Sequence, residues 1–372
     1  MYFDKVMKKV LYVSPHPYLC STSSTISYNI LKQLSLRDDI YVVCYAIIPE
    51  DSTFISDRKI TSENIYIFDA KKSEENFEQC LKMSTPDLIL INNKLSECVK
   101  YFELCEFHKC EKISIVNAYY EHFNSKLVNF LNNTCSEIYT HKNIQLGYEK
   151  KLISKEIACS QLKLDSSFFY VLTLTNNNSS RKRYDIYIKS VVMFFKMHDA
   201  EITKNVKFVL ATNINKHFNL LEIFTIECKK HDLDLKFTDI FVIIQNPHTL
   251  DDSLLSLFYN IAAIGLNTSD GDGWGLWNLT HMSHGAPQIV PNLPCFDKFI
   301  TNENSTCIPS KLSYYVCTNE GGEAHMIDPK VVAQVLFMYV TDKETYDKHS
   351  QNAVCETANF CWSNAVSELV AE

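Results

Sequence analysis

Short apolar runs alternate with helix-like patterns along the whole chain. In the first half, candidate strands lie at 10–14, 40–46, 65–68, 88–91, 113–116 and 137–140. In the second half, they lie at 168–174, 206–211, 241–244, 262–266 and 288–290. Between the first two runs, Ile26, Ile30, Leu31 and Leu34 fall on one face of a helix predicted over 24–36. This alternation predicts βαβ units around parallel sheets.

The length of the chain predicts two domains. A chain of 372 residues is longer than one hydrophobic core usually supports. We therefore expect two domains of roughly 150–200 residues each. The least structured link lies at 162–167, and we place the boundary there. Two doubly wound domains that face each other leave a cleft at the carboxyl ends of their strands, where ligands bind in such sheets.

Composition narrows the class of protein. Apolar residues make up 46% and charged residues 22% of the chain, as in well-packed globular proteins. The net charge is −8 and no stretch concentrates Lys and Arg, which argues against a nucleic-acid partner. The apolar run 10–13 is too short for a signal peptide, and no run approaches the ~20 residues that span a bilayer. The 14 cysteines form no Cys-x-x-Cys pair, so we expect reduced thiols and a cytoplasmic protein.

Glycine is concentrated in one place. Five of the eight glycines lie between 265 and 285. Those at 271, 273 and 275 follow the apolar segment 261–266 and precede a helical segment at 277–284. Glycine permits backbone conformations and close approaches that other residues do not. A strand, a glycine-rich turn and a helix start together predict a site for a negatively charged ligand.

The residues of this turn resemble a known motif. The segment from Asn267 to Pro291 resembles the donor-site motif of family 4 glycosyltransferases, which are retaining enzymes of the GT-B fold. That motif reads Ser-x-x-Glu-Gly-Phe-Gly-Leu, followed by a helix with a second Glu and then Gly-x-Pro-Val-Ile. Ser269, the run Asp272–Leu276 and the run Gly285–Ile289 fall in register with it. The resemblance implies an α/β protein of GT-B fold, with two doubly wound Rossmann-like domains facing across a cleft.

The resemblance also implies roles for the turn. The residues Gly273, Trp274, Gly275 and Leu276 would bind the donor, with backbone amides closing on its diphosphate. Asp272, in place of the first Glu, would hydrogen-bond the hydroxyls of the donor sugar. The second acid, which binds the nucleotide ribose in the family, is replaced by Thr280. A threonine hydroxyl accepts a bond without carrying charge, so either Thr280 binds the ribose weakly or His281 or another group holds it.

A basic segment follows the predicted strand at 168–174. It contains Asn177, Arg181 and Lys182 and looks like the family's basic pair after the first strand of the donor domain. Arg and Lys at a strand end can neutralise a departing diphosphate. The resemblance therefore makes Arg181 and Lys182 catalytic and Asn177 donor-binding. The alternative is a solvated basic loop.

The first half carries weaker candidates. His16, Ser21 and Ser23 follow the first strand, and their side chains either contact the acceptor or a phosphate, or cap the helix that begins near Ser24. His122 is a candidate for the histidine that relatives place near the donor sugar, and its alternative is a structural role.

Two metal-like patterns are discounted. Asp270-Gly-Asp272 matches a metal-binding Asp-x-Asp, but it lies inside a motif of a fold that usually transfers sugars without metal, so we expect no metal. His281 and His284 are three apart on a helix without a third ligand nearby, so we interpret them as surface residues.

The resemblance completes the predicted organisation. Residues 1–165 form the acceptor-side domain, 166–345 the nucleotide-sugar domain, and 346–372 a helical segment that crosses back to the first domain. The implied function is retaining transfer of a sugar from a nucleotide diphosphate sugar to a glycan, protein or small-molecule hydroxyl acceptor. The nucleotide sugar is a co-substrate, no cofactor is implied, and membrane contact is not expected. The alternatives are a catalytically weak or inactive relative of the same fold that binds nucleotide sugar or glycan as an interaction module, and another nucleotide-sugar enzyme of this fold such as an epimerase.

Overall fold

Two compact units make up the protein. The computed structural model describes residues 7–49, 54–55, 57–70, 74–120, 125–140, 142–175, 178–245, 250–316 and 321–370. The first unit comprises Met1–Gly147, Val316–Gly322 and Phe360–Glu372, and the second comprises Tyr148–Tyr315 and Glu323–Asn359. Apart from the short segment 316–322, the units change at 147 and 359, whereas the sequence led us to place these boundaries at 165 and 345. The reason at the first boundary is α5 (Lys155–Leu162), which packs against α10 (Asp252–Ile261) of the second unit.

The first unit is built on a six-stranded parallel sheet. Its strands are β1 (Lys8–Pro15), β2 (Ile40–Ile47), β3 (Ile65–Ala70), β4 (Leu88–Asn93), β5 (Glu111–Val116) and β6 (Glu137–Tyr139). They lie in the order β3-β2-β1-β4-β5-β6, and each neighbouring pair is parallel. All six strands predicted in this half are confirmed. The order reverses between β1 and β4, the point at which ligands bind in open parallel sheets.

Helices cover both faces of this sheet. They are α1 (Thr22–Leu34), α2 (Glu74–Ser84), α3 (Leu95–Leu104), α4 (Ser125–Thr134) and α14 (Trp362–Leu369). Side chains of a strand alternate between faces. Leu11 and Val13 of β1 accordingly join a core with α2, α3 and α4. Tyr12 points to the α1 face, where its hydroxyl accepts a hydrogen bond from Asn92, which also bonds Ser27 of α1.

The helix α14 belongs to the first unit although it comes after the whole second unit. It contacts α1, and Trp362, Val366 and Leu369 are buried. The Tyr139 hydroxyl of β6 donates to the Glu368 carbonyl at 3.0 Å. These contacts join the last helix to the sheet as well as to α1.

The packing of α14 requires glycine at position 147. A Cβ atom there would lie 2.3 Å from the Trp362 backbone nitrogen and 2.6 Å from the Cys361 carbonyl carbon. Because backbone atoms cannot yield without moving α14, we expect Gly147→Ala to lower the free energy of unfolding by about 2 kcal/mol. Chemical denaturation followed by circular dichroism measures this. An unchanged midpoint would show that α14 is free to shift.

The second unit has its own six-stranded parallel sheet. Its strands are β7 (Phe169–Leu174), β8 (Val206–Ala211), β9 (Phe241–Ile244), β10 (Ala262–Leu266), β11 (Gln288–Pro291) and β12 (Thr306–Ile308). They lie in the order β12-β11-β10-β7-β8-β9, and each neighbouring pair is parallel. The five strands predicted here, β7 to β11, are confirmed, and β12 was not predicted. The strand order reverses between β7 and β10.

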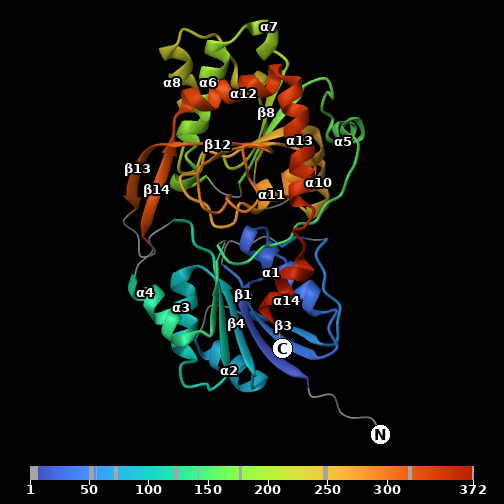
Figure 1. Ribbon diagram of the computed structural model, residues 1–372, viewed down its shortest axis with the longest axis vertical. Helices are drawn as coiled ribbons and strands as arrows, with labels where there is room; N and C mark the ends of the chain where they lie inside the picture. The colour runs from blue at the N-terminus through green and yellow to red at the C-terminus, as the bar shows by residue number, and fades with distance from the viewer. Residues whose placement is uncertain are drawn as a thin grey trace. The chain divides into compact units, whose positions relative to one another are not determined.

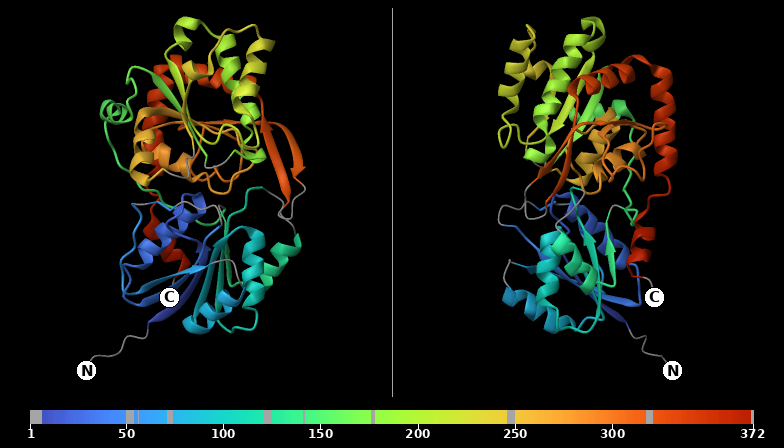
Figure 2. Two further views of the ribbon diagram at one scale, coloured as in Figure 1. Left: turned by 180° about the vertical axis from the view of Figure 1, so that it is seen from behind. Right: turned by 60° about the vertical axis from the view of Figure 1, so that its left-hand side comes forward.

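Helices lie on both faces of the second sheet (Figures 1 and 2). Beyond α5 and α10, they are the 3₁₀ turn η1 (Ser180–Lys182), α6 (Tyr184–Met197), α7 (Ala200–Thr203), α8 (Leu220–Lys230), α9 (Phe237–Ile240), α11 (Leu276–Ser283), α12 (Pro329–Thr341) and α13 (Lys343–Thr357). Val171 of β7 packs in a core with α6, α8 and α12. Its neighbours Tyr170 and Leu172 pack with α5 and α10 on the opposite face.

A hairpin stands apart from the second sheet. Its strands, β13 (Ser310–Val316) and β14 (Gly322–Ile327), form a separate two-stranded sheet (Figure 1). The side chains of Leu312 and Tyr315 are mostly exposed. This hairpin was not predicted from the sequence, and most residues of β13 are exposed.

Across the described ranges, no helix is both long and apolar enough to cross a bilayer. The cysteines in those ranges are free, and many of them, such as Cys44 and Cys98, are buried.

Candidate functional site

The two motifs predicted from the sequence lie side by side in the second unit. The basic segment follows β7 and the glycine-rich turn follows β10, and these two strands are hydrogen-bonded neighbours. The Asp270 backbone N–H donates to the Arg181 carbonyl at 2.9 Å, which joins the two loops directly. Both loops therefore lie at the carboxyl edge of the sheet, where the strand order reverses.

Two cations and one carboxylate meet at this point. The Lys182 Nζ donates to Asp272 Oδ2 at 3.1 Å, and the Arg181 Nη1 lies 3.8 Å from the same oxygen. The Arg181 Nη1 also donates to the Gly271 carbonyl. All three charged side chains are at most 15% exposed. The group carries an excess of one positive charge in a poorly solvated place, which favours the binding of an anion.

The protonation of these groups follows from burial and proximity. Burial lowers the pKa of Lys182 to about 8, Arg181 adds to this effect, and Asp272 opposes it. Burial alone would raise the pKa of Asp272, but Lys182 and Arg181 lower it to about 2. At neutral pH, Asp272 is therefore ionised and Lys182 is mostly an ammonium group close to its titration range.

Diphosphate binding should depend on pH through Lys182. A diphosphate placed at this group would be held by the ammonium form, so its affinity would be highest well below pH 8 and would fall as the pH rises through the pKa of Lys182. We expect the dissociation constant of UDP to be about tenfold higher at pH 9 than at pH 7. Calorimetric titration at both values measures this. The Lys182→Arg variant is the control, because a guanidinium keeps its charge over this range; equal pH dependence in both proteins would contradict the assignment.

The turn needs glycine at its last position. Gly275 caps α11 with φ +58°, and a Cβ atom there would lie 2.5 Å from Cε1 of Phe296. The left-handed conformation and the close contact both exclude larger residues. The helix α11 therefore begins at Leu276, four residues after Asp272.

The other positions of the turn are less available to a ligand than the sequence suggested. The Gly273 N–H donates to Asp272 Oδ1 at 2.8 Å, so Asp272 accepts hydrogen bonds from both this amide and Lys182. Trp274 and Leu276 are buried, at 6% and 7% exposure. The indole nitrogen of Trp274 has no hydrogen-bond partner among the described residues. A bound anion would compete with Asp272 for the same donors.

The helix α11 corrects one interpretation. The Thr280 hydroxyl donates to the Leu276 carbonyl of its own helix at 2.9 Å. His281, which we interpreted as a surface residue, is fully buried. Its Nε2 lies 3.1 Å from the Ala262 carbonyl, and burial lowers its pKa to about 3. The interpretation was wrong because buried partners satisfy the ring, and His281 is not available to a ribose. His284 is partly buried, and its Nδ1 lies 2.8 Å from the Thr280 carbonyl.

His281 ends a chain of buried amides beneath the turn. Its Nδ1 accepts from Gln288 Nε2 at 3.2 Å, and Gln288 Oε1 accepts from Asn278 Nδ2 at 2.8 Å. Asn278 Oδ1 accepts from Asn267 Nδ2 at 3.0 Å, and Asn267 Oδ1 accepts from the Ser269 N–H at 2.9 Å. Every amide in the chain points the same way. The network ties β10, α11 and β11 to the start of the turn, and the sequence analysis missed it.

Two predicted residues, Asn177 and His122, lie outside the described residues. The next residue, Asn178, is buried. Its amide nitrogen donates to the Asn213 and Phe218 carbonyls at 2.9 and 2.7 Å, and its oxygen accepts from the Phe218 N–H. Asn178 thus fixes the loop after β8 to the basic segment.

The candidates of the first unit lie at the carboxyl end of β1. Ser21 Oγ accepts from the Ser24 N–H at 3.0 Å and caps α1. Ser23 Oγ accepts from Asn117 Nδ2 at 2.9 Å. His16 is buried, with Nε2 3.1 Å from Asp69 Oδ1 and Nδ1 accepting from the Tyr18 N–H at 3.2 Å. These side chains already have partners within the unit.

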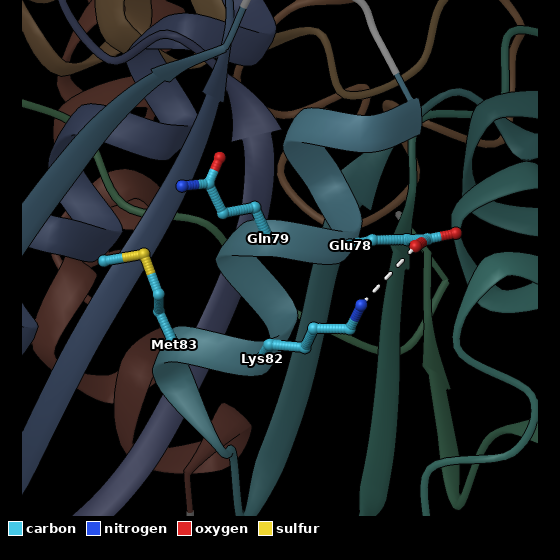
Figure 3. Close-up of a pocket in the computed structure, with 4 residues that line it drawn as sticks. All are labelled: Glu78, Gln79, Lys82 and Met83. Atoms are coloured by element: carbon cyan, nitrogen blue, oxygen red, sulfur yellow. Dashed lines mark ion pairs between the residues drawn. The ribbon is translucent and has the colours of Figure 1, made fainter.

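Other features of the described residues do not compete with this site. No group of three or more His, Cys, Asp and Glu among them is arranged to hold a metal ion. A shallow hollow lies on α2, lined by Glu78, Gln79, Lys82 and Met83 (Figure 3). All four residues come from one helix, and the Glu78–Lys82 ion pair spans 3.8 Å between exposed side chains.

Comparison with known proteins shows a likeness in fold. No protein-family model matches the sequence, and no curated protein is similar to it in sequence. Sucrose-phosphate synthase from Thermosynechococcus elongatus aligns with a TM-score of 0.70 at 12% identity, over 97% of each chain. HepE from Anabaena, solved in complex with UDP, aligns with a TM-score of 0.68 at 11% identity, over 97% of this chain and 98% of that one. WaaG, a glycosyltransferase involved in lipopolysaccharide biosynthesis, gives 0.63 at 10% identity, over 98% and 100%. The predicted fold is thereby confirmed: the chain has the GT-B fold of two Rossmann-like domains.

Proposed function

We propose that the protein is a glycosyltransferase that moves a sugar from a nucleotide diphosphate sugar to a hydroxyl acceptor, with retention at the anomeric carbon. The observation that carries the proposal is the mostly buried group of Arg181, Lys182 and Asp272 with its excess positive charge. Its carboxylate lies four residues before the start of α11, at the reversal of strand order in the second sheet. Helix starts and cations at this place suit a diphosphate.

Each group has a distinct task in this proposal. When the bond from the anomeric carbon to the diphosphate oxygen breaks, its electron pair leaves with the diphosphate, and Arg181 and Lys182 stabilise that charge. The acceptor oxygen forms the new bond and gives up its proton to the departing diphosphate or to water. Backbone amides of the turn at Gly273 and Gly275 hold the diphosphate.

Asp272 acts as a placeholder before the donor arrives. It now accepts hydrogen bonds from Lys182 and from the Gly273 N–H. A diphosphate would take over these donors, because it carries more charge than one carboxylate. The released carboxylate can then accept hydrogen bonds from donor-sugar hydroxyls, which orients the sugar for transfer.

The acceptor is assigned to the first unit. The resemblance found in the sequence places the acceptor there, and the carboxyl end of β1 carries the polar residues His16, Ser21 and Ser23. The proposal includes a glycan, a protein or a small molecule as acceptor, and no metal.

A second candidate function is a binding module with little or no turnover. It is favoured by Thr280, whose hydroxyl is engaged with the Leu276 carbonyl and which replaces a carboxylate of the resembling family. A panel of UDP- and GDP-sugars separates the two. Hydrolysis or transfer supports the enzyme, and binding without turnover supports the module. No binding of any nucleotide diphosphate would refute the enzyme and a module that binds nucleotide sugar.

A further inference from the structure

Tyr314 connects the separate hairpin to the glycine-rich turn. It lies on β13, and its hydroxyl donates to Asp270 Oδ2 and accepts from Arg183 Nη1 at 3.1 Å. Burial and the neighbouring Asp270 raise its pKa, so the hydroxyl keeps its proton and can donate at neutral pH. One residue of the hairpin thus joins the start of the turn to the end of the basic segment.

Asp270 is held from several directions. Its carbonyl accepts from the His325 N–H of β14 at 2.9 Å, and its own N–H donates to the Arg181 carbonyl at 2.9 Å. The side chain is almost fully buried, at 2% exposure. Both strands of the hairpin therefore contact Asp270, two residues before the carboxylate that pairs with Lys182.

Arg183 provides the other end of the bridge. Its backbone has φ +48°, a left-handed conformation that is rare for residues other than glycine. Its guanidinium makes two parallel bonds to Asp185, at 2.9 and 2.7 Å, besides the bond to Tyr314. The Thr268 hydroxyl lies 3.3 Å from both the Lys182 and Arg183 carbonyls. A strained residue next to Lys182 is held by side-chain contacts, one of which is to Tyr314.

We propose that Tyr314 is a positioning residue that fixes the Asp270–Asp272 turn and the Lys182–Arg183 segment relative to each other, and that the β13–β14 hairpin is part of the donor site. The hydroxyl of Tyr314 is the group that spans the two segments. Its effect on ligands rests on the proposed function, because it sets the separation of Lys182 and Asp272 that a diphosphate meets. The effect of Tyr314 on the conformation of the turn does not rest on the proposed function.

The test compares Tyr314→Phe with the control Tyr315→Phe. Tyr314→Phe keeps the ring and removes the bridging hydroxyl, whereas Tyr315 is the next residue on the same strand and is 72% exposed. Hydrogen exchange of the amides at 268–276 is measured without ligand, with the peptide covering β8 as an internal reference for global loosening. We expect exchange in the turn to become about fivefold faster in Tyr314→Phe alone, the scale of one lost hydrogen bond.

UDP binding is measured on the wild-type protein and on the two variants. We expect about fivefold weaker binding in Tyr314→Phe and an unchanged affinity in Tyr315→Phe. The inference is overturned if the hydrogen-exchange rates of the turn are equal in the two variants. It is also overturned if Tyr314→Phe speeds exchange in the turn and in β8 alike. Faster turn exchange with equal UDP affinity overturns its ligand part. If the wild-type protein binds no nucleotide diphosphate, the proposed function fails, and the exchange result alone decides whether Tyr314 positions the turn.

Discussion

The double variant Arg181→Ala/Lys182→Ala should lose at least about a thousandfold in turnover of a nucleotide diphosphate sugar. The substitutions change the buried group from two cations with one carboxylate to a lone carboxylate. The site proposed to attract a diphosphate would then repel it, and the departing charge would have no counterion. Steady-state kinetics on the best donor of the panel measures the loss.

Two controls make this result specific. The variant Lys229→Ala/Lys236→Ala removes the same charge from exposed positions of the same unit, and it should keep turnover near that of the wild type. The active-site variant also leaves Asp272 buried without its cations, which destabilises the fold. UDP affinity is therefore also compared between Asp272→Asn and the triple variant that adds both alanines. Equal affinity in that pair, or turnover within tenfold of wild type in the double variant, would refute the assigned roles.

The substitution Asn278→Leu should have the largest effect on stability. Asn278 lies in the middle of the buried amide chain and is fully buried. Its removal leaves Asn267 Nδ2 and Gln288 Oε1 without these partners, at about 1–3 kcal/mol for each buried group. We expect the free energy of unfolding of the second unit to fall by about 4 kcal/mol. Thermal melting followed by tryptophan fluorescence, to which Trp274 and Trp277 contribute, measures the change.

The matched control for this prediction is Asn352→Leu on α13. Asn352 Nδ2 donates to the Glu303 carbonyl at 2.7 Å, but this bond is exposed to solvent. Water replaces the lost partner there, so the expected loss is below about 1 kcal/mol. A melting shift no larger for Asn278→Leu than for Asn352→Leu would mean that the amide chain contributes little to stability.

The parallel strands could be predicted from the sequence because both faces of each sheet are buried. A strand such as β4 then reads as an unbroken apolar run, Leu88–Ile91, bounded by polar residues. The strands β12, β13 and β14 were not predicted, and β13 lacks this signal because it is mostly exposed. Their positions depend on packing that no local pattern records.

The candidate site could be predicted where a residue needed for chemistry or for backbone conformation also belongs to a recognisable sequence motif. Gly275 must be glycine for conformational reasons, and Arg181 and Lys182 lie at a strand end, so both motifs left a trace in the sequence. The partners of Asp270 left none, because Tyr314 reaches it only through the tertiary fold. For the same reason, the ring of His281 looked like a surface group, although Gln288 and a carbonyl of β10 enclose it.

The place of α14 has a consequence for how the chain matures. The first unit needs α14 to cover α1, yet this helix is synthesised only after the entire second unit. During translation, the apolar side chains of α1 that meet α14 stay uncovered while the second sheet forms. The second unit can therefore complete its core before the first, and the N-terminal half matures last.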